Sequence, residues 1–376
     1  MLLTEEQRLI QENARLLATK EIRPFAKSWA QNKTFPTSAI QALSLAGFMG
    51  MLIPPSLGGT QLSYLSYVLV IEEIAKADGA LSTIVSVHNS VANLPILLFG
   101  TDKQKTKYLV PMAKGEKLGC FCLSEPQAGS DASNIQTKAT QKGNEFILNG
   151  VKQFVTSGKN ADIAIVFART SADKKQGISA FIVPTDTKGY KVAKCENKMG
   201  QHASEIAQVV FEDLVIPQEN LLGQLGMGYK IALSNLESGR LGVAAQSIGM
   251  AQEALDLSLN YAKERKAFDK LLCEHEAVSF RLADMATQLS AAKQLLYHAA
   301  TLRDNHLPCL QEASMAKLFA SEMAERVCRD AISIFGGYGY LQDFPLEQIY
   351  RDVRVASIYE GTSDIQRLII GRELTK

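Results

Sequence analysis

Apolar positions follow three successive patterns along the chain. From residue 4 to about 117 they recur at helical spacing, and Thr4-x-x-Gln7 has the pattern of a capping box at the first helix start. Leu65–Ala77 is a second helix candidate. Pro95 lies inside an apolar run, so we expect its helix to end or kink there. Residues 1–117 are therefore predicted to form an N-terminal helical domain.

Short apolar runs separated by turn signals replace the helical pattern from residue 118 to 226. Asn149-Gly150 lies between two such runs and is the strongest hairpin signal in the chain. Further strand candidates are 163–167 and 178–183, joined by the polar turn 171–176, and 209–211. Several short strands joined by turns predict a middle domain of antiparallel β-structure, a sandwich or a barrel.

Helical spacing returns over residues 227–376, and the predicted helices are long. They cover 231–265 and 277–303, and the second carries one apolar stripe made of Leu282, Met285, Leu289, Ala292 and Leu296. Long antiparallel helices make a bundle. The prediction is an α+β protein, ordered α, β, α, that ends in a C-terminal four-helix bundle.

Composition excludes several classes of protein. The 376 residues are 46% hydrophobic and 21% charged, with a net charge of +1, so there is no basic face for nucleic acid. No run of about 18 apolar residues is visible, so no membrane span is expected. The N-terminus lacks the layout of a signal peptide. The six cysteines lack disulfide-framework spacing, which is typical of a reducing compartment.

No metal site is predicted. The five histidines form no metal-binding pair. Cys120 and Cys122 are too close together for ordinary zinc geometry and have no nearby histidine, so we interpret them as buried free thiols.

The segment from Ile358 to Arg367 is the first candidate for chemistry. It reads Ile-Tyr-Glu-Gly-Thr-Ser-Asp-Ile-Gln-Arg, with Glu360 just before a helix start, where free backbone N–H groups and the positive dipole end lie. Taken alone, helix capping by Thr362 or Ser363 with a solvated Glu360 is the simpler interpretation.

Two other segments carry weaker signals. Residues 119–131 read as a strand that ends in a Pro/Gly turn with hydroxyls and free N–H groups; such a turn can hold an anion, although most hold nothing. Residues 264–268 (Glu-Arg-Lys-Ala-Phe) read as a helix end whose basic residues suit the negative end of the dipole.

Together these segments resemble the acyl-CoA dehydrogenases, flavoenzymes that oxidise acyl-CoA thioesters, and the resemblance covers essentially the whole chain. It implies that Glu360 removes the α-proton of the substrate while the β-carbon delivers hydride to flavin N5, giving a trans-2-enoyl-CoA. Gly239 stands where the long-chain and isovaleryl branches place their catalytic Glu, so in this chain the base can only be Glu360.

The resemblance also implies FAD as the cofactor and a set of binding residues. Thr156 would donate to flavin N5, and Arg265 would reach the FAD pyrophosphate of a neighbouring subunit. Substrate contacts would come from Ser130, Glu237, Arg240 and Gly361. The implied cofactor contacts are Phe121, Leu123, Ser124, Ser130, Phe154, Val155, Thr156, Arg265, Phe268, Glu276, Ser333, Gly336, Gly337, Thr362 and Asp364.

Four positions depart from the family pattern. Phe154 stands where many relatives carry Trp, Ser333 and Glu276 stand where Gln is usual, and Asp269 replaces a Gly. Two extra carboxylates near a pyrophosphate would repel it unless they point elsewhere. The expectation is weaker retention of FAD without loss of function.

The short-chain (butyryl-CoA) branch is the most similar, and the short/branched 2-methylacyl-CoA branch is second. The resemblance implies electron transfer flavoprotein as the acceptor and a homotetramer, a dimer of dimers. The alternatives are an acyl-CoA oxidase, which is usually longer, and a flavin-free or nucleic-acid-binding scaffold of the same fold. The compartment would be the cytoplasm for a bacterial protein, or the mitochondrial matrix for a mature eukaryotic form.

Overall fold

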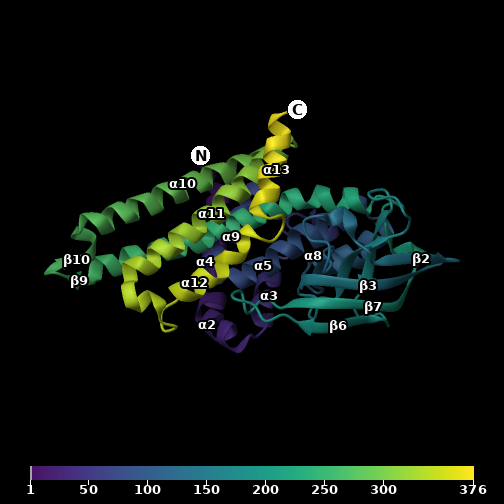
Figure 1. Cartoon of the computed structure of the whole chain (residues 1–376), viewed down its shortest axis with the longest axis horizontal. Coiled ribbons are helices and arrows are strands. Elements are labelled where there is room, and N and C mark those ends of the chain that lie inside the picture. Colours follow the sequence, from purple (N-terminus) through teal and green to yellow (C-terminus); the bar gives the residue numbers. More distant parts are fainter. Residues whose placement is uncertain (1) are drawn as a thin grey trace.

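The computed structural model describes residues 2–376 and has the predicted order of helices, sheet and helices (Figure 1). This confirms the α+β class, with a helical N-terminal part, a β-domain in the middle and a helical C-terminal part. The N-terminal helices are α1 (Glu5–Leu17), α2 (Arg23–Asn32), α3 (Thr37–Leu45), α4 (Tyr64–Ala77), α5 (Gly79–Val87), α6 (Asn93–Phe99), α7 (Asp102–Gln104) and α8 (Val110–Ala113).

The predicted capping box starts α1. The Gln7 N–H donates to Thr4 Oγ1 at 3.2 Å, and the Thr4 N–H donates back to Gln7 Oε1 at 2.9 Å. Helix α4 is buried from Leu65 to Ala75 on every side, not only along one stripe. It therefore forms the centre of the helical body.

The helix continues past Pro95 instead of ending there. Helix α5, a π-helical turn (His88–Ala92) and α6 follow one another without a break. Proline lacks an N–H, and its ring clashes with the carbonyl four residues earlier. A wider π turn just before the proline lets the chain stay helical around that defect. Similar π turns, Ala18–Ile22 and Lys105–Leu109, precede Pro24 and Pro111.

The stretch Gly79–Phe99 also departs from the expectation about membrane spans. Among the described residues it is the one helix long and apolar enough, by length and composition, to cross a membrane. However, 83% of its most apolar window is buried inside the protein. That burial is typical of a core helix.

The middle domain is a single eight-stranded sheet of order β6-β7-β3-β2-β4-β5-β8, with β1 paired to β4. Most pairs are antiparallel as predicted, but β1 runs parallel to β4, and a single bridge pairs β2 in parallel with β4. The strands are β1 (Gly119–Cys122), β2 (Lys138–Lys142), β3 (Glu145–Thr156), β4 (Ile163–Arg169), β5 (Ile178–Pro184), β6 (Tyr190–Cys195), β7 (Ile206–Pro217) and β8 (Leu221–Leu222).

Asn149-Gly150 is not a hairpin turn. Strand β3 runs through it, and the pairing register with β7 shifts there, so the pair forms a bulge. The turn lies earlier, between Lys142 and Glu145, which are paired across Gly143-Asn144. Gly143 has φ 62°, as a tight hairpin turn requires. Both Asn149-Gly150 and Gly143-Asn144 are typical hairpin-turn dipeptides, and strand pairing places the turn at the earlier one.

Strands β4 and β5 are buried on both faces of the sheet. Alternate residues point to opposite faces. In β4, Ile163, Ile165 and Phe167 join the large core shared with the helices, whereas Ala164, Val166 and Ala168 join a separate core inside the β-domain. The sheet is thereby fixed against the helical body.

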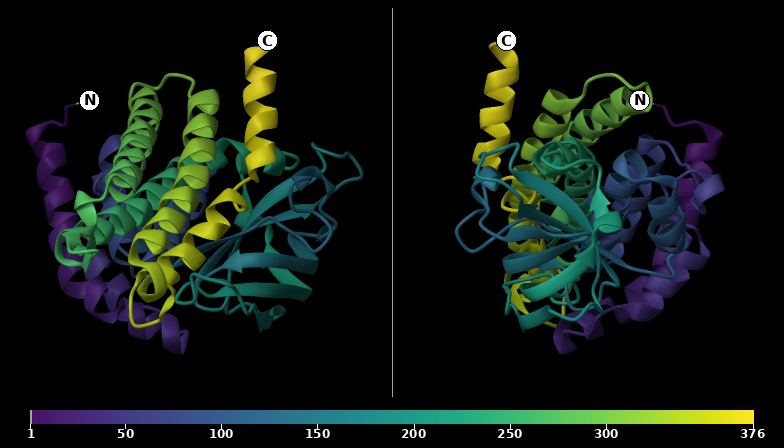
Figure 2. Two further views of the ribbon diagram at one scale, coloured as in Figure 1. Left: turned by 60° about the vertical axis from the view of Figure 1, so that its left-hand side comes forward. Right: turned by 90° about the vertical axis from the view of Figure 1, so that its right-hand side faces the viewer.

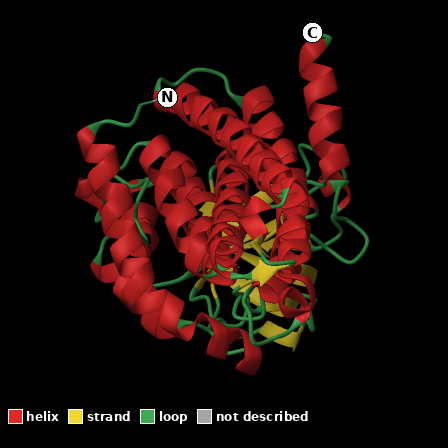
Figure 3. Cartoon of the chain, turned by 90° about the vertical axis from the view of Figure 1, so that its left-hand side faces the viewer, coloured by secondary structure: helices red, strands yellow, loops and turns green. Residues whose placement is uncertain are grey.

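The C-terminal part consists of three long helices, α9 (Gly228–Glu264), α10 (Glu276–Asp304) and α11 (Leu310–Phe335), followed by α12 (Leu346–Val353) and α13 (Ser363–Leu374). They lie in front of the sheet in Figure 3. The predicted stripe of α10 is buried. A small hairpin, β9 (Lys266–Ala267) and β10 (Lys270–Leu271), joins α9 to α10. Helix α13 stands away from the body (Figure 2) and exposes Leu368 and Leu374.

Candidate active site

The Glu360 carboxylate points inward, against helix α9. Glu360 and Gly361 both have left-handed backbone conformations, with φ 51° and 89°, between a 3-10 turn and α13. The side chain is thereby directed at Gly239, where an added Cβ would overlap the carboxylate oxygens. A left-handed non-glycine residue is strained, so surrounding contacts must hold it.

The carboxylate is poised to accept a proton near neutral pH. Glu360 Oε2 is buried and has no hydrogen-bond partner among the described residues. Burial raises the pKa of Glu360 to about 7, against the opposing effects of Lys317 and then Arg240. A general base works best when its pKa lies near the operating pH.

Arg240 has unused donors in the same region. The residue is buried, and its Nε and Nη1 have no hydrogen-bond partner within the described chain. Burial lowers its pKa, while Glu237 and Glu360 act in the opposite direction. The Glu237 carboxylate instead pairs with Arg303 at 3.3 Å. An Arg side chain with free N–H groups beside the base suits a polar or anionic ligand.

The segments expected to line the flavin meet where β1 ends beside β3. The Gln153 N–H donates to the Ser124 carbonyl at 2.8 Å and joins the two segments. Phe154 lies at a bulge of β3 with φ 59°, and its side chain is 66% exposed. Phe121, Leu123, Val155 and Thr156 lie on the same two segments. An exposed aromatic ring on a strained bulge offers a contact surface for a planar ligand.

A buried ion pair supports that surface from below. Lys152 Nζ lies 2.7 Å from Glu125 Oε1 and also donates to the Leu123 carbonyl at 3.1 Å. Glu125 additionally accepts from the backbone N–H groups of Gln136 and Thr137. Burial alone would raise the pKa of Glu125, but Lys152 and these donors lower it. The pair therefore fixes the Leu123–Ser124 segment to strand β3.

The other cofactor and substrate contacts expected near Glu360 and the sheet are more exposed to solvent or serve in helix capping. Ser130 is exposed on the loop after β1. The Thr362 hydroxyl accepts from the Ile365 N–H at 3.3 Å and caps α13. Asp364 is exposed and pairs with Arg367 at 3.2 Å. For Thr362 the structure shows helix capping, which the sequence already allowed.

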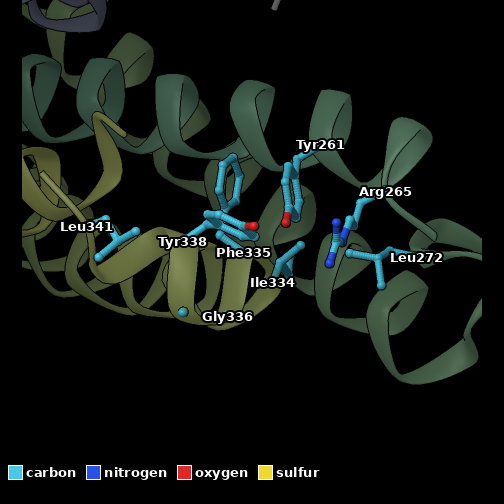
Figure 4. A pocket seen from close by; sticks show the side chains of 9 residues that line it. Tyr261, Arg265, Leu272, Ile334, Phe335, Gly336, Tyr338 and Leu341 are labelled. Atoms are coloured by element: carbon cyan, nitrogen blue, oxygen red, sulfur yellow. The ribbon is translucent and has the colours of Figure 1, made fainter. Parts of the chain in front are cut away.

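A second site lies at the far end of the bundle (Figure 4). It is a pocket of about 530 Å³ lined by residues from α9, the turn before α10, α11 and the segment after α11: Tyr261, Arg265, Leu272, Ile334, Phe335, Gly336, Gly337, Tyr338 and Leu341. The Arg265 guanidinium lies 5.7 Å from the Tyr338 ring centre, and no described acidic side chain pairs with it. A Cβ at Gly336 or Gly337 would meet nothing within 4 Å. An unpaired Arg beside open backbone fits a phosphate group.

Phe268 and two of the departures from the family pattern, Glu276 and Ser333, lie outside this pocket lining. Phe268 is 91% exposed at the β9–β10 hairpin, and its ring meets His275 edge-on at 6.3 Å. Glu276 is exposed in the first turn of α10. Ser333 is exposed and donates to the Arg329 carbonyl at 3.1 Å.

One chain does not bring the two sites together. Gly239 lies about a third of the way along α9, whereas Arg265 caps its C-terminal end, and a rise of 1.5 Å per residue separates them by about 39 Å. Figure 1 shows the same separation, with the β9–β10 hairpin far from α13 and the sheet. The implied FAD contacts therefore form two groups in each chain.

Several residues near Glu360 were not predicted from the sequence. Tyr359 donates to Gln246 at 2.8 Å, and Gln246 donates to Thr83 at 2.8 Å, which ties the catalytic segment to α5. Lys317 and Gln366 bind the backbone beside Glu360. Lys317 had a signal as a charged residue on a helix face of otherwise small residues, and Gln366 lies in the segment around Glu360. Among the described residues there is no cluster of three or more metal-ligating side chains.

Three family models cover almost the whole chain: the N-terminal (4–116), middle (120–214) and C-terminal (226–375) domains of acyl-CoA dehydrogenase. The chain is 43% identical to short-chain specific acyl-CoA dehydrogenase of Rattus norvegicus, over 100% of this chain and 91% of that protein. It is also 43% identical to the caffeyl-CoA reductase-Etf complex subunit CarC of Acetobacterium woodii, over the full length of both. Butyryl-CoA dehydrogenase from Megasphaera elsdenii superposes with a TM-score of 0.98 at 40% identity, covering both chains fully. The chain therefore belongs to the acyl-CoA dehydrogenase family, FAD-dependent oxidoreductases that act on CH–CH bonds of acyl-CoA.

Proposed function

We propose that this protein dehydrogenates a short-chain acyl-CoA to the trans-2-enoyl-CoA, with Glu360 as the base. The observation that carries the proposal is the Glu360 carboxylate set against Gly239, whose Oε2 is buried without a hydrogen-bond partner among the described residues and whose pKa is raised to about 7. A carboxylate in that state can take the α-proton of a thioester near neutrality. The names of the short-chain and butyryl-CoA relatives support the chain length.

The residues around Glu360 have separate tasks in this proposal. The Glu360 backbone N–H has no acceptor within the described chain, so it is free to donate to the thioester carbonyl as enolate character develops. Arg240 and Ser130 would contact the CoA part of the substrate. Bound FAD supplies the hydride acceptor. Its ring would lie against Ser124, Phe154 and Thr156.

The separation of the two sites supports a homo-oligomer, a tetramer in our proposal. Arg265, Gly336 and Gly337 suit the phosphates of FAD but lie about 39 Å along α9 from the catalytic region. A second copy would therefore supply this pocket to the flavin of the first. The exposed Leu368 and Leu374 of α13 are further apolar surface that an assembly would cover.

Electron transfer flavoprotein is the proposed electron acceptor. A relative of equal length carries the name of a subunit in a complex with Etf, which supports this partner. Oxygen consumption at the rate of substrate turnover would contradict it and favour an oxidase.

The proposal is tested by replacing Glu360 with Gln, an isosteric amide that cannot accept the proton. Anaerobic mixing with butyryl-CoA should bleach the flavin of wild-type protein and leave that of Glu360→Gln oxidised for orders of magnitude longer, with FAD content unchanged. Glu212→Gln, which removes an exposed carboxylate on β7 that pairs with Lys191, is the control. Near wild-type bleaching by Glu360→Gln would refute Glu360 as the base.

A chain-length series in the same assay tests the substrate. We expect the fastest flavin reduction with butyryl-CoA. A faster reaction with 2-methylbutyryl-CoA would place the protein in the short/branched class instead.

A further inference from the structure

Lys317 is a charged residue in a buried environment. It lies on α11 with its side chain fully buried. Its neighbours on the same helix face are small and buried: Ala313, Ser314, Ala320 and Ser321. Buried ammonium groups are destabilising unless they have partners. The contacts of Lys317 should therefore explain why a lysine lies there.

Those contacts lead to the backbone of the catalytic turn. Lys317 Nζ donates to the Gly361 carbonyl at 2.7 Å. Gln366, fully buried on α13, donates through Nε2 to the same carbonyl at 2.9 Å and to the Glu360 carbonyl at 3.2 Å. Two side chains from two helices thus bind both carbonyls of the left-handed turn.

This arrangement matters because the turn sets the position of the carboxylate. Left-handed conformations persist at non-glycine residues only where the surroundings fix them. Other backbone conformations of Glu360 would point its carboxylate away from Gly239. With both carbonyls bound from the protein side, the Glu360 N–H stays free of any acceptor in the described chain.

We propose that Lys317 and Gln366 are positioning residues for the base: they hold the Glu360–Gly361 turn, and Lys317 also provides a compensating positive charge. This inference rests on the proposed role of Glu360. Neither residue needs to touch the substrate. Both act by fixing where the carboxylate and the free N–H lie.

The charges around Glu360 indicate that Lys317, unlike the neutral Gln366, also influences the pKa of the carboxylate. The titratable groups that face this cluster are Tyr67 from α4, Glu237 and Arg240 from α9, Cys309 just before α11, Lys317 and Glu322 from α11, Tyr359 beside Glu360, and Arg372 from α13. Lys317 opposes the rise in the pKa of Glu360 more than Arg240 does. Burial lowers the pKa of Lys317 to about 8, with Glu360 the main opposing influence. The Lys317 ammonium and the Glu360 carboxylate therefore each favour the charged form of the other.

Two methionine variants separate the positioning effect from the charge effect. Lys317→Met removes a donor and a charge, whereas Gln366→Met removes donors only; both replacements are linear and apolar. We expect each to slow flavin reduction by butyryl-CoA about tenfold at its own optimal pH, since a displaced base reacts more slowly. Only Lys317→Met should move the acidic limb of the pH–rate profile upward, by about one pH unit, because the base loses its counter-charge.

Three controls keep the outcome decisive. Arg326→Met removes a charge from α11 without touching the turn, since Arg326 donates to Gln288, and should behave as wild type. If Lys317→Met fails to fold, Lys317→Gln replaces it, because glutamine keeps a donor without the charge. This variant should shift the acidic limb of the pH–rate profile without changing the rate at optimal pH. Glu360→Gln in the same assay tests the base itself, so its result is independent of the positioning variants.

The inference is overturned if Lys317→Met and Gln366→Met both keep the wild-type rate and profile while Glu360→Gln is inactive. An equal limb shift in both variants would overturn the charge assignment to Lys317. A crystal structure of Gln366→Met gives a readout apart from activity, with residue 360 expected to leave its left-handed φ. An unchanged turn in that structure would also contradict the positioning role of Gln366.

Discussion

Two regions of helix α9, one around Gly239 and one at its C-terminal end at Arg265, differ in how far the chain encloses their functional side chains. In the first region the Glu360 carboxylate is buried against Gly239 with its turn bound from two helices. In the second, Arg265 lies in an open pocket without an acidic partner in the described chain, beside bare glycine backbone. In the first region the chain itself buries and holds the carboxylate. The second has unused binding capacity facing outward.

The difference follows from the chemistry each region requires. A base must be desolvated so that its pKa rises toward neutrality, and burial does that within a single fold. A phosphate site needs an unpaired guanidinium and exposed N–H groups, which remain free only where the chain itself does not cover them. Substitutions in the catalytic region should therefore change rate or stability, and substitutions at the distal end should change cofactor affinity.

The largest effect is expected beneath the flavin-lining segment. Lys152→Met leaves Glu125 buried without its cation, and breaking such a pair costs about 3–5 kcal/mol of unfolding free energy. Urea unfolding of the FAD-loaded protein measures this loss. Lys191→Met removes an exposed partner of Glu212 and should cost less than about 1 kcal/mol. Equal losses in the two variants would contradict the support role of the buried pair.

Gly239→Ala should separate rate from stability. The new Cβ would displace the Glu360 carboxylate, a flexible side-chain end, and misplacing a base can cost about 100-fold in rate. The helix itself should gain about 0.5–1 kcal/mol, because glycine is a poor helix former. Gly371→Ala, where nothing lies within 4 Å, is the matched control in α13. Wild-type flavin reduction by Gly239→Ala would show that the carboxylate tolerates displacement.

Arg265→Ala should weaken FAD binding without changing the chemistry of bound cofactor. Losing a charge-assisted contact costs about 1.5–3 kcal/mol, roughly a 10- to 150-fold rise in Kd. The melting temperature should fall when FAD is limiting, since FAD binds the native state. Lys263→Ala removes a cation from the same last turn of α9 and serves as control. Full FAD retention through gel filtration would contradict the assignment of Arg265.

The smallest effect is expected at Glu276. Its side chain is exposed and does not line the distal pocket, so Glu276→Gln should leave FAD affinity unchanged at low salt. Losing a negative charge in the first turn of α10 should cost only about 0.3–1 kcal/mol of stability. Titration of deflavinated protein with FAD measures the affinity. Tighter binding by the variant would show that Glu276 does repel the pyrophosphate.

Local sequence rules predicted the elements wherever one strong signal acted alone. The capping box at Thr4, the stripe of α10 and the order of helices and strands are examples. The hairpin prediction was wrong where strand pairing chose between two similar signals: Asn149-Gly150 became a bulge because β3 continues through it in its pairing with β7. At Pro95 the helix did not end, and the irregularity there is a π turn just before the proline.

The sequence alone marked Glu360, Arg265 and the segments around Ser124 and Thr156, since each lies in a short contiguous motif. Gly239 and Gln366 also lie in segments that the sequence singled out, whereas Lys317 does not, and only packing sets α9 and α11 against the Glu360 turn. Burial, and with it the raised pKa of Glu360, also depends on all of these neighbours at once. A motif can therefore specify which residue is the base, but desolvation and the left-handed turn that aims it arise from contacts between distant segments, which no local pattern encodes.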